Sequence, residues 1–252
     1  MTVLAVSPPG EIATRYSLRV ASDGPDVRAA QRLRYLVFAE ELGAVLHSPA
    51  AGLDIDEFDA HCDHLVIAEE TTGAVVGTYR MLPPHRVAQT GRCYTEGEFD
   101  LSALSSVRGE LVEAGRACVH PDHRTGAVIN LMWTGIARYL HLIGHRWLAG
   151  CVSIPLTDGG ATARGVWDLV RARHLSPVGL RVTPLRPWAV AADPAAAGRV
   201  ALPPLLRGYL RLGAWVCGPP AHDPDFGVAD LFVLLSLDRV DPRYLRHFLD
   251  AP

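Results

Sequence analysis

Two charged side chains interrupt an apolar segment near the middle of the chain. The segment Leu111–Val119 has the composition of a buried strand, yet it carries Glu113 and Arg116. Burying a charge is costly unless the charge is paired or used, so both side chains need a reason. Alternation would put them on opposite faces, whereas a bulge at Gly115 would bring both to one face and splay the strand. The segment predicts a catalytic site, and a structural ion pair explains the two charges equally well.

The turn that follows, residues 120–126, reads HPDHRTG and connects the strand to a helix. Free N–H groups and the positive end of the helix dipole favour a phosphate at such a point. Arg124 adds a positive charge and Gly126 allows close approach. The turn predicts an anion site, with a plain strand-to-helix connection as the alternative.

An acidic loop, which contains Asp54, Asp56 and Asp59, precedes another predicted strand. These carboxylates suit an amine or a cation, although a solvated loop commonly has such a run. Arg34 and Phe38 lie one turn apart on a predicted helix, and Arg80 interrupts a predicted strand. Isolated arginines are usually solvated, so these residues carry weight only in combination.

Known metal and nucleotide motifs find little support. His61, Cys62 and His64 lie close together, but no second pair of ligands stands at zinc spacing, so we expect no metal. The chain has no GxSxG, P-loop or complete GxGxxG motif, which disfavours serine hydrolysis and nucleotide hydrolysis.

Composition narrows the class of protein. The chain has 252 residues, a net charge of −3, 49% hydrophobic and 20% charged residues, which is typical of a globular protein and not of a disordered chain or a nucleic-acid binder. The longest uncharged apolar run is too short to cross a bilayer, and the N-terminus lacks the basic leader of a signal peptide. The five scattered cysteines favour a reducing compartment. We expect a cytoplasmic protein, with peripheral contact at the inner face of the membrane left open.

Hydrophobic periodicity predicts alternating strands and helices over a single domain, residues 1–252. The predicted strands are 16–21, 64–70, 74–82, 110–119, 147–154, 180–185 and 228–237. The predicted helices are 25–43, from the 120–126 turn to about 143, and 161–174. A hairpin at Thr-Thr-Gly followed by strand–helix–strand units predicts an α/β (α+β) fold with a mixed central sheet and helices on both faces.

Together these segments resemble the ornithine acyl-carrier-protein N-acyltransferase family, part of the GNAT superfamily. The resemblance rests on five segments: RLRYLVFAEELGA (32–44), DIDEFDAHCDHL (54–65), VVGTYRMLP (75–83), LVEAGRACVHPDHR (111–124) and the long segment 202–235. It implies a GNAT-like, mostly antiparallel sheet with splayed central strands, and residues 186–252 as a family-specific extension of the same domain.

The first half is also similar to the acyl-homoserine-lactone synthases. Their Arg-x-x-x-Phe pattern matches Arg34 and Phe38, and their acidic set matches Asp54, Asp56 and Asp59. Their strand Arg matches Arg80, and their Glu-x-x-Arg pattern matches Glu113 and Arg116. Two departures weigh against signal synthesis, since Ala44 replaces a Trp of those synthases and the C-terminal part is longer. The GNAT phosphate loop survives only as 124–126, so ordinary binding of coenzyme A is not expected.

The resemblance implies transfer of a (3-hydroxy) fatty acyl group from acyl carrier protein to the α-amine of L-ornithine, which gives lyso-ornithine lipid in a bacterium. Glu113 and Arg116 are then the catalytic candidates. Binding of the amino acid falls to Arg34, Phe38, Asp54, Asp56, Asp59 and Arg80. Binding of the donor's 4′-phosphopantetheine falls to Val119, Arg124, Thr125 and Gly126. No other cofactor is expected.

An acidic carrier protein needs a local basic face, which five arginines could supply: Arg138, Arg146, Arg164, Arg171 and Arg173. Three alternatives stay open at this point. The chain could acylate another amino acid or amine, act as an acyl-homoserine-lactone-type synthase, or be a non-catalytic lipid-binding, haemolysin-like protein. The last would need an exposed amphipathic helix, and residues 205–212 are a short candidate interrupted by Gly208.

Overall fold

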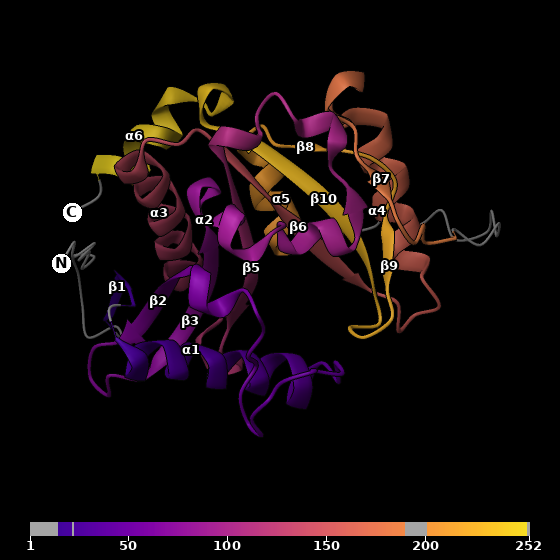
Figure 1. The fold of residues 1–252 in the computed structure, drawn as a ribbon. Coiled ribbons are helices and arrows are strands. Elements are labelled where there is room, and N and C mark those ends of the chain that lie inside the picture. The colour runs from indigo at the N-terminus through magenta and orange to yellow at the C-terminus, as the bar shows by residue number, and fades with distance from the viewer. Residues whose placement is uncertain (1–14, 22, 190–200, 251–252) are drawn as a thin grey trace. The chain divides into compact units, whose positions relative to one another are not determined.

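A computed structural model describes residues 15–21, 23–189 and 201–250 of the chain (Figure 1). Their contacts divide into two compact units. Unit 1 takes in the described parts of Met1–Thr90, Ala114–His145 and Pro242–Pro252, and unit 2 those of Gly91–Glu113 and Arg146–Asp241. The expected extension, 186–252, contributes to both units, and its residues 190–200 lie outside the described ones.

Unit 1 contains strands in the order β1-β2-β3-β5, where β5 is Leu111–Val119, and β2 pairs antiparallel with both β1 and β3. The first three strands are β1 (Tyr16–Val20), β2 (Asp63–Glu69) and β3 (Val75–Leu82). Leu18 pairs with Ile67 between β1 and β2, and β2 turns back into β3 through the predicted Thr-Thr-Gly hairpin. The middle of β2 and most of β3 are buried, because their β-branched and aromatic side chains are packed between helices.

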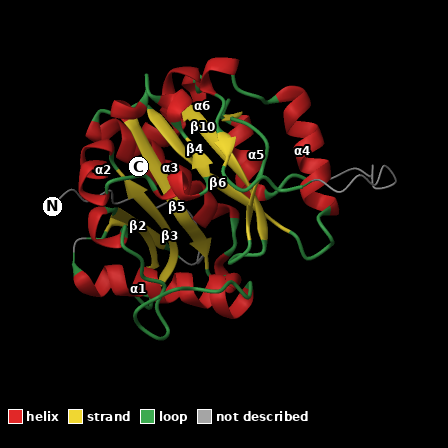
Figure 2. Cartoon of the chain, turned by 45° about the vertical axis from the view of Figure 1, so that its right-hand side comes forward, coloured by secondary structure: helices red, strands yellow, loops and turns green. Residues whose placement is uncertain are grey.

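Helices cover both faces of these strands. Helix α1 (Gly24–Tyr35) packs on β2 and β3, and α3 (Gly126–Ile143) packs on β1, β2 and β3. Figures 1 and 2 show the two helices on opposite sides of the strands. Two shorter helices complete unit 1, α2 (Pro84–Thr90) and α6 (Pro242–Asp250), and α6 packs on α3.

The predicted helix 25–43 is real but changes its winding. After α1 the chain continues as a π-helix, η1 (Leu36–Glu41), in which the Leu42 amide donates to the Val37 carbonyl. Gly43 ends the segment with a left-handed φ of 74°. π-Helical turns are rare and mark functional sites more often than ordinary helix does.

Unit 2 contains a second set of strands, in the order β5-β6-β10-β8 with β9 beside β10. They are β6 (Trp147–Pro155), β8 (Trp215–Val216), β9 (Ala221–Asp223) and β10 (Val228–Ser236). A separate pair joins β4 (Phe99–Asp100) to β7 (Thr183–Pro184). The helices of this unit are α4 (Ala161–Arg173) and α5 (Pro204–Arg211). β6 and β10 pair antiparallel over their whole length, and every residue of β10 is buried.

Strand β5 (Leu111–Val119) belongs to both units, to unit 2 as far as Glu113 and to unit 1 from Ala114. Its parallel register with β6 covers Leu111–Glu113, and α3 is the crossover between the two strands. The expected mixed, mostly antiparallel sheet with helices is therefore confirmed.

The predicted strand 180–185 is largely wrong. Residues Val178–Leu180 form a 3-10 turn, and only Thr183–Pro184 pair as a strand. Thr183 and Pro184 pair with the two-residue strand β4, and Pro184 has no N–H to donate to a longer ladder.

No helix among the described residues is long and apolar enough to cross a membrane. The N-terminal residues 1–14, for which we expect no signal peptide, lie outside the described part of the chain.

Candidate active site

In unit 1 a fully buried guanidinium organises the acidic loop. Arg34, on α1, donates from Nη1 and Nη2 to the two carboxylate oxygens of Asp59 at 2.9 and 2.7 Å. Its Nε lies 2.9 Å from Asp54 Oδ2, and Nη2 also donates to the Asp54 carbonyl. Arg34 is 0% exposed, and Asp54 and Asp59 are buried. The acidic loop is therefore not a solvated run of charges.

Two further arginines reach the same loop. Arg80, on β3, donates from Nη1 to Asp56 Oδ1 at 2.6 Å and to Asp59 Oδ1 at 2.9 Å. Arg116, on β5, lies 3.1 Å from Asp54 Oδ2 and 3.4 Å from Asp56 Oδ2. We call the six residues the charge network: Arg34, Arg80, Arg116, Asp54, Asp56 and Asp59. Its formal charges balance.

The charge network fixes the ionisation of its most connected carboxylate. Burial alone would raise the pKa of Asp59, but the hydrogen bonds and charges of Arg34 and Arg80 outweigh it and hold that pKa well below its usual range. Gln31 adds a donor to Asp59 at 3.1 Å. Asp56 is the most exposed of the three acids, with 20% of its side chain accessible, so it is the carboxylate best placed to meet a cation from solvent.

Phe38, the remaining residue expected to bind the amino-acid substrate, lies in η1 and is buried, with 9% of its surface exposed. Its carbonyl accepts a hydrogen bond from the Ala44 amide at 2.8 Å, and this bond fixes the turn that follows the π-helix. The structure thus places the six residues expected to bind the amino acid, together with Arg116, in unit 1 and joins all of them except Phe38 in one network.

We expect Asp59→Asn to lower the stability of the protein strongly. The change leaves Arg34 and Arg80 buried with too little negative charge, and breaking a buried pair costs about 3–5 kcal/mol. The melting temperature should fall by roughly 6–20 °C.

The control is Asp238→Asn, which removes the largely exposed pair between Asp238 and Arg146 and should cost less than about 1 kcal/mol. Equal melting temperatures for the two variants would show that the charge network does not hold unit 1 together.

Glu113, in unit 2, has a different set of partners. Its Oε1 accepts from the Thr95 amide at 2.8 Å and the Thr95 hydroxyl at 2.5 Å, and its Oε2 accepts from the Tyr94 amide at 2.7 Å. These donors begin the short 3-10 helix Tyr94–Gly97. Because three donors occupy the two oxygens of a buried side chain, the geometry favours a positioning role over proton acceptance.

The irregularity expected at Gly115 falls one residue later. Arg116 has a φ of 54°, and it is the one non-glycine residue in the described ranges with a positive φ. Such a conformation costs about 1–3 kcal/mol and persists where the surroundings hold it, here through Asp54 and Asp56. The local break in alternation leaves residues 115–117 half-buried.

We expect Glu113→Gln to lower kcat by roughly a hundredfold, because the amide would face the Tyr94 N–H with a donor and displace the segment it holds. If Glu113 only positions this segment, the acidic limb of the pH–rate profile stays. If Glu113 accepts the proton itself, the limb disappears. Thr95→Val, which removes only the hydroxyl donor, is the matched control and should cause a smaller loss of the same kind.

The predicted donor turn connects β5 to α3 as expected. Thr125 caps the helix through its hydroxyl, which accepts from the Val128 amide at 3.5 Å. Arg124 donates from Nε to the Val119 carbonyl at 3.2 Å, and its two Nη atoms donate to Glu41 at 2.7 and 2.5 Å. A Cβ on Gly126 would meet nothing within 4 Å, so the helix start is open.

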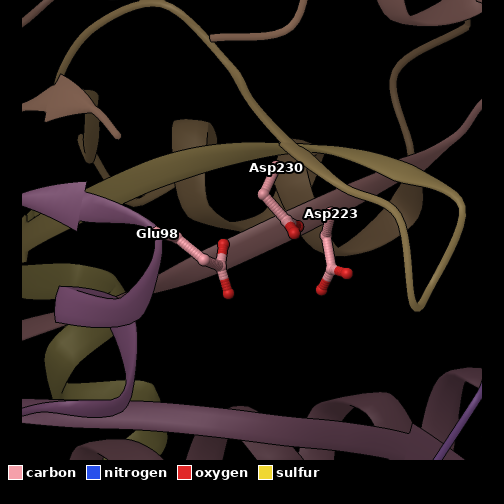
Figure 3. Close-up of side chains that lie close together, drawn as sticks. All are labelled: Glu98, Asp223 and Asp230. Atoms are coloured by element: carbon pink, nitrogen blue, oxygen red, sulfur yellow. The ribbon is translucent and has the colours of Figure 1, made fainter. Parts of the chain in front are cut away.

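A second acidic cluster in unit 2 escapes the sequence analysis. Glu98, Asp223 and Asp230 are all buried, and their carboxylate oxygens lie within 4.8 Å of one another (Figure 3). Burial and the charges of Asp230 and Asp223 raise the pKa of Glu98 to about 9, and the Cys151 thiol donates to Glu98 at 3.5 Å. A carboxyl group at this position is therefore neutral at pH 7. The sequence does hold a signal for the cluster: Asp230 is a charged residue within the apolar strand β10, just as Glu113 is within β5.

We expect Glu98→Gln to stabilise the protein, and more so as the pH rises. The pKa of Glu98 is higher in the folded chain than its usual 4.5, so the folded state binds the extra proton and wild-type stability falls between about pH 4.5 and 9. The variant is neutral throughout and lacks this loss. Melting curves from pH 5 to 9 measure it, with the exposed Glu110→Gln as control. Parallel pH dependence for Glu98→Gln and the wild type would contradict the assignment.

Comparison with known proteins places the sequence in a family. The sequence model for the acetyltransferase (GNAT) domain matches residues 33–134. An L-ornithine N(alpha)-acyltransferase of Rhodobacter capsulatus is 37% identical over 91% of this chain and 93% of its own length. A protein of the same name from Rhizobium meliloti is 33% identical over 91% of this chain and 83% of its own length.

Solved structures agree on the fold. A CoA-dependent acyl-homoserine lactone synthase superposes with a TM-score of 0.53 at 17% identity, over 90% of this chain and 82% of that one. An N-acyl amino acid synthase from uncultured soil microbes gives a TM-score of 0.52 at 12% identity, over 91% of this chain and 94% of that one. The GNAT-like fold is thereby confirmed, and the protein is an acyltransferase. By its similarity over nearly the whole length, the chain belongs to the L-ornithine N(alpha)-acyltransferase family.

Proposed function

We propose that the protein transfers a (3-hydroxy) fatty acyl group from acyl carrier protein to the α-amine of L-ornithine, which forms lyso-ornithine lipid. The observation that carries the proposal is the 37% identity with an L-ornithine N(alpha)-acyltransferase, over 91% of this chain and 93% of that protein. The resemblance of the first half to acyl-homoserine-lactone synthases supports the fold alone, because the solved synthases share 17% identity or less with the chain.

The reaction needs an uncharged amine and a polarised thioester. The nitrogen lone pair attacks the carbonyl carbon, a C–N bond forms, and the carbonyl electron pair moves to oxygen. The tetrahedral intermediate then re-forms the carbonyl and expels the thiolate, while the nitrogen loses a proton and the sulfur gains one. Our candidates for stabilising the oxyanion are the backbone N–H groups of residues 115–117, a segment that includes the strained Arg116.

The proposed roles follow from the contacts of each group. Glu113 positions the segment at Tyr94 and Thr95, or accepts the amine's proton through a water molecule. The charge network binds the amino acid: Arg116, the most exposed of its three arginines, suits the substrate carboxylate, and Asp56 suits the side-chain ammonium. An ammonium at Asp56 would share that carboxylate with Arg80 and Arg116.

On the donor side, the turn of Val119, Arg124, Thr125 and Gly126 would hold the phosphate of 4′-phosphopantetheine. Three of the arginines expected to contact the carrier protein share helix α4: Arg164, Arg171 and Arg173. Asp168 pairs with two of them, so part of the charge of this helix is already neutralised. Arg138 lies on α3, where it donates to the Phe248 carbonyl, and Arg146 lies in the loop before β6, where it pairs with Asp238.

We expect the purified protein to acylate ornithine in preference to glutamine and glycine, and Asp56→Asn to raise the KM for ornithine roughly ten- to a hundredfold. Losing one charge-assisted hydrogen bond costs about 1.5–3 kcal/mol. The KM for glutamine should change much less.

Asp63→Asn, which alters another partly exposed carboxylate paired with an arginine, is the control and should leave the KM for ornithine near that of the wild type. A wild type that prefers a neutral amino acid refutes ornithine as the acceptor. An equal effect of Asp56→Asn on all acceptors refutes the role given to Asp56.

A further inference from the structure

The pairing of Arg124 with Glu41 bears on the choice of acyl donor. Glu41 ends the π-helix η1, and its two carboxylate oxygens accept from both Nη atoms of Arg124, at 2.7 and 2.5 Å. The Nε of Arg124 is engaged as well, by the Val119 carbonyl. Three of the five N–H groups of this guanidinium therefore have acceptors within the described residues.

The pair is solvent-facing and ionised. The side chains of Arg124 and Glu41 are 46% and 31% exposed, so an anion arriving from solvent can reach both. The hydrogen bond from Arg124 lowers the pKa of Glu41, which keeps its carboxylate negative at neutral pH. An incoming phosphate thus meets an arginine with two free N–H groups and a fixed negative charge beside it.

The two donor classes differ in how many anionic groups they bring to this point. The prosthetic group of a carrier protein has one phosphodiester, with a single ionisable oxygen. Coenzyme A has a pyrophosphate at the same place and a further phosphate on its ribose. The single phosphodiester can use the remaining N–H groups of Arg124 and the open start of α3. The pyrophosphate needs more donors and suffers more repulsion from Glu41.

We propose that Glu41 is a specificity-determining residue, which holds Arg124 in a state that accepts the single phosphodiester of a carrier-protein thioester and disfavours the pyrophosphate of acyl-coenzyme A. The inference rests on the proposed function, because it assigns the donor phosphate to Arg124. The inference adds Glu41, the last residue of the π-helix, to the donor site. It also suggests a function for the π-helix, which places the Glu41 carboxylate opposite Arg124.

The test compares the two donors, with the same acyl chain, for the wild type and for Glu41→Gln. We expect the wild type to use the carrier-protein thioester far better. Glu41→Gln should lower the KM for acyl-coenzyme A about tenfold and change the KM for the carrier-protein thioester less than about threefold, with kcat little altered. The gain should shrink at high ionic strength, because the interaction is between exposed charges.

Two variants control the measurement. Glu40→Gln removes the neighbouring exposed carboxylate and the same charge, and it should change neither KM. Arg124→Ala combined with Glu41→Gln should lose the gain, because Glu41 acts at the phosphate through Arg124. Inhibition of the carrier-protein reaction by free coenzyme A gives a binding readout that does not depend on turnover of the coenzyme A thioester, and Glu41→Gln should tighten it about tenfold.

Equal effects of Glu41→Gln on both donors would overturn the inference, since Glu41 would then only orient Arg124. A wild type that prefers acyl-coenzyme A would also overturn it. Failure of the proposed function looks different: neither donor would then acylate ornithine in the presence of the wild-type protein.

Discussion

A guanidinium with no access to water must be matched by carboxylates, and Arg34 imposes this constraint on unit 1. An unpaired charge in a protein interior costs several kcal/mol, a large part of a domain's stability, so Arg34 depends on Asp54 and Asp59. The loop that carries these acids has little regular structure of its own. The pairing of its carboxylates with Arg34 on α1 fixes the path of the loop. Arg80 on β3 and Arg116 on β5 pair with the carboxylates of the same loop.

The result is a charge-balanced, largely buried network instead of a bare acidic patch, and under the proposed function this network binds the amino acid. Because Asp54 and Asp59 are occupied, the more exposed Asp56 remains the carboxylate most open to a cation. The network also supports the left-handed Arg116, whose strained backbone lies in the strand that carries Glu113 three residues earlier.

Local signals predicted the elements better than the contacts between them. The β2–β3 hairpin follows from two β-branched runs around Thr-Thr-Gly, and the limits of α3 follow from a capping Thr125 and a left-handed Gly144. The charged residues were found because each interrupts an apolar pattern. Their pairing was not predictable, since spacing along the chain does not show that Asp54 faces Arg34 or that Glu41 faces Arg124. The Glu98 cluster was missed for the same reason: its members come from three separate segments, and only Asp230 breaks a pattern.

Under the proposed function, the arginine-paired carboxylates bind a dibasic amino acid, and the helix start beside Arg124 binds a donor with one phosphodiester. The most direct test of this account is tandem mass spectrometry of the lipids made by cells that express the chain, compared with cells that express Glu113→Gln. The account predicts a new lipid in the wild-type cells whose fragments place one fatty acyl group on the α-amine of ornithine and leave the side-chain amine free. An acyl group on another amino acid, on the side-chain amine of ornithine, or on homoserine lactone would contradict it.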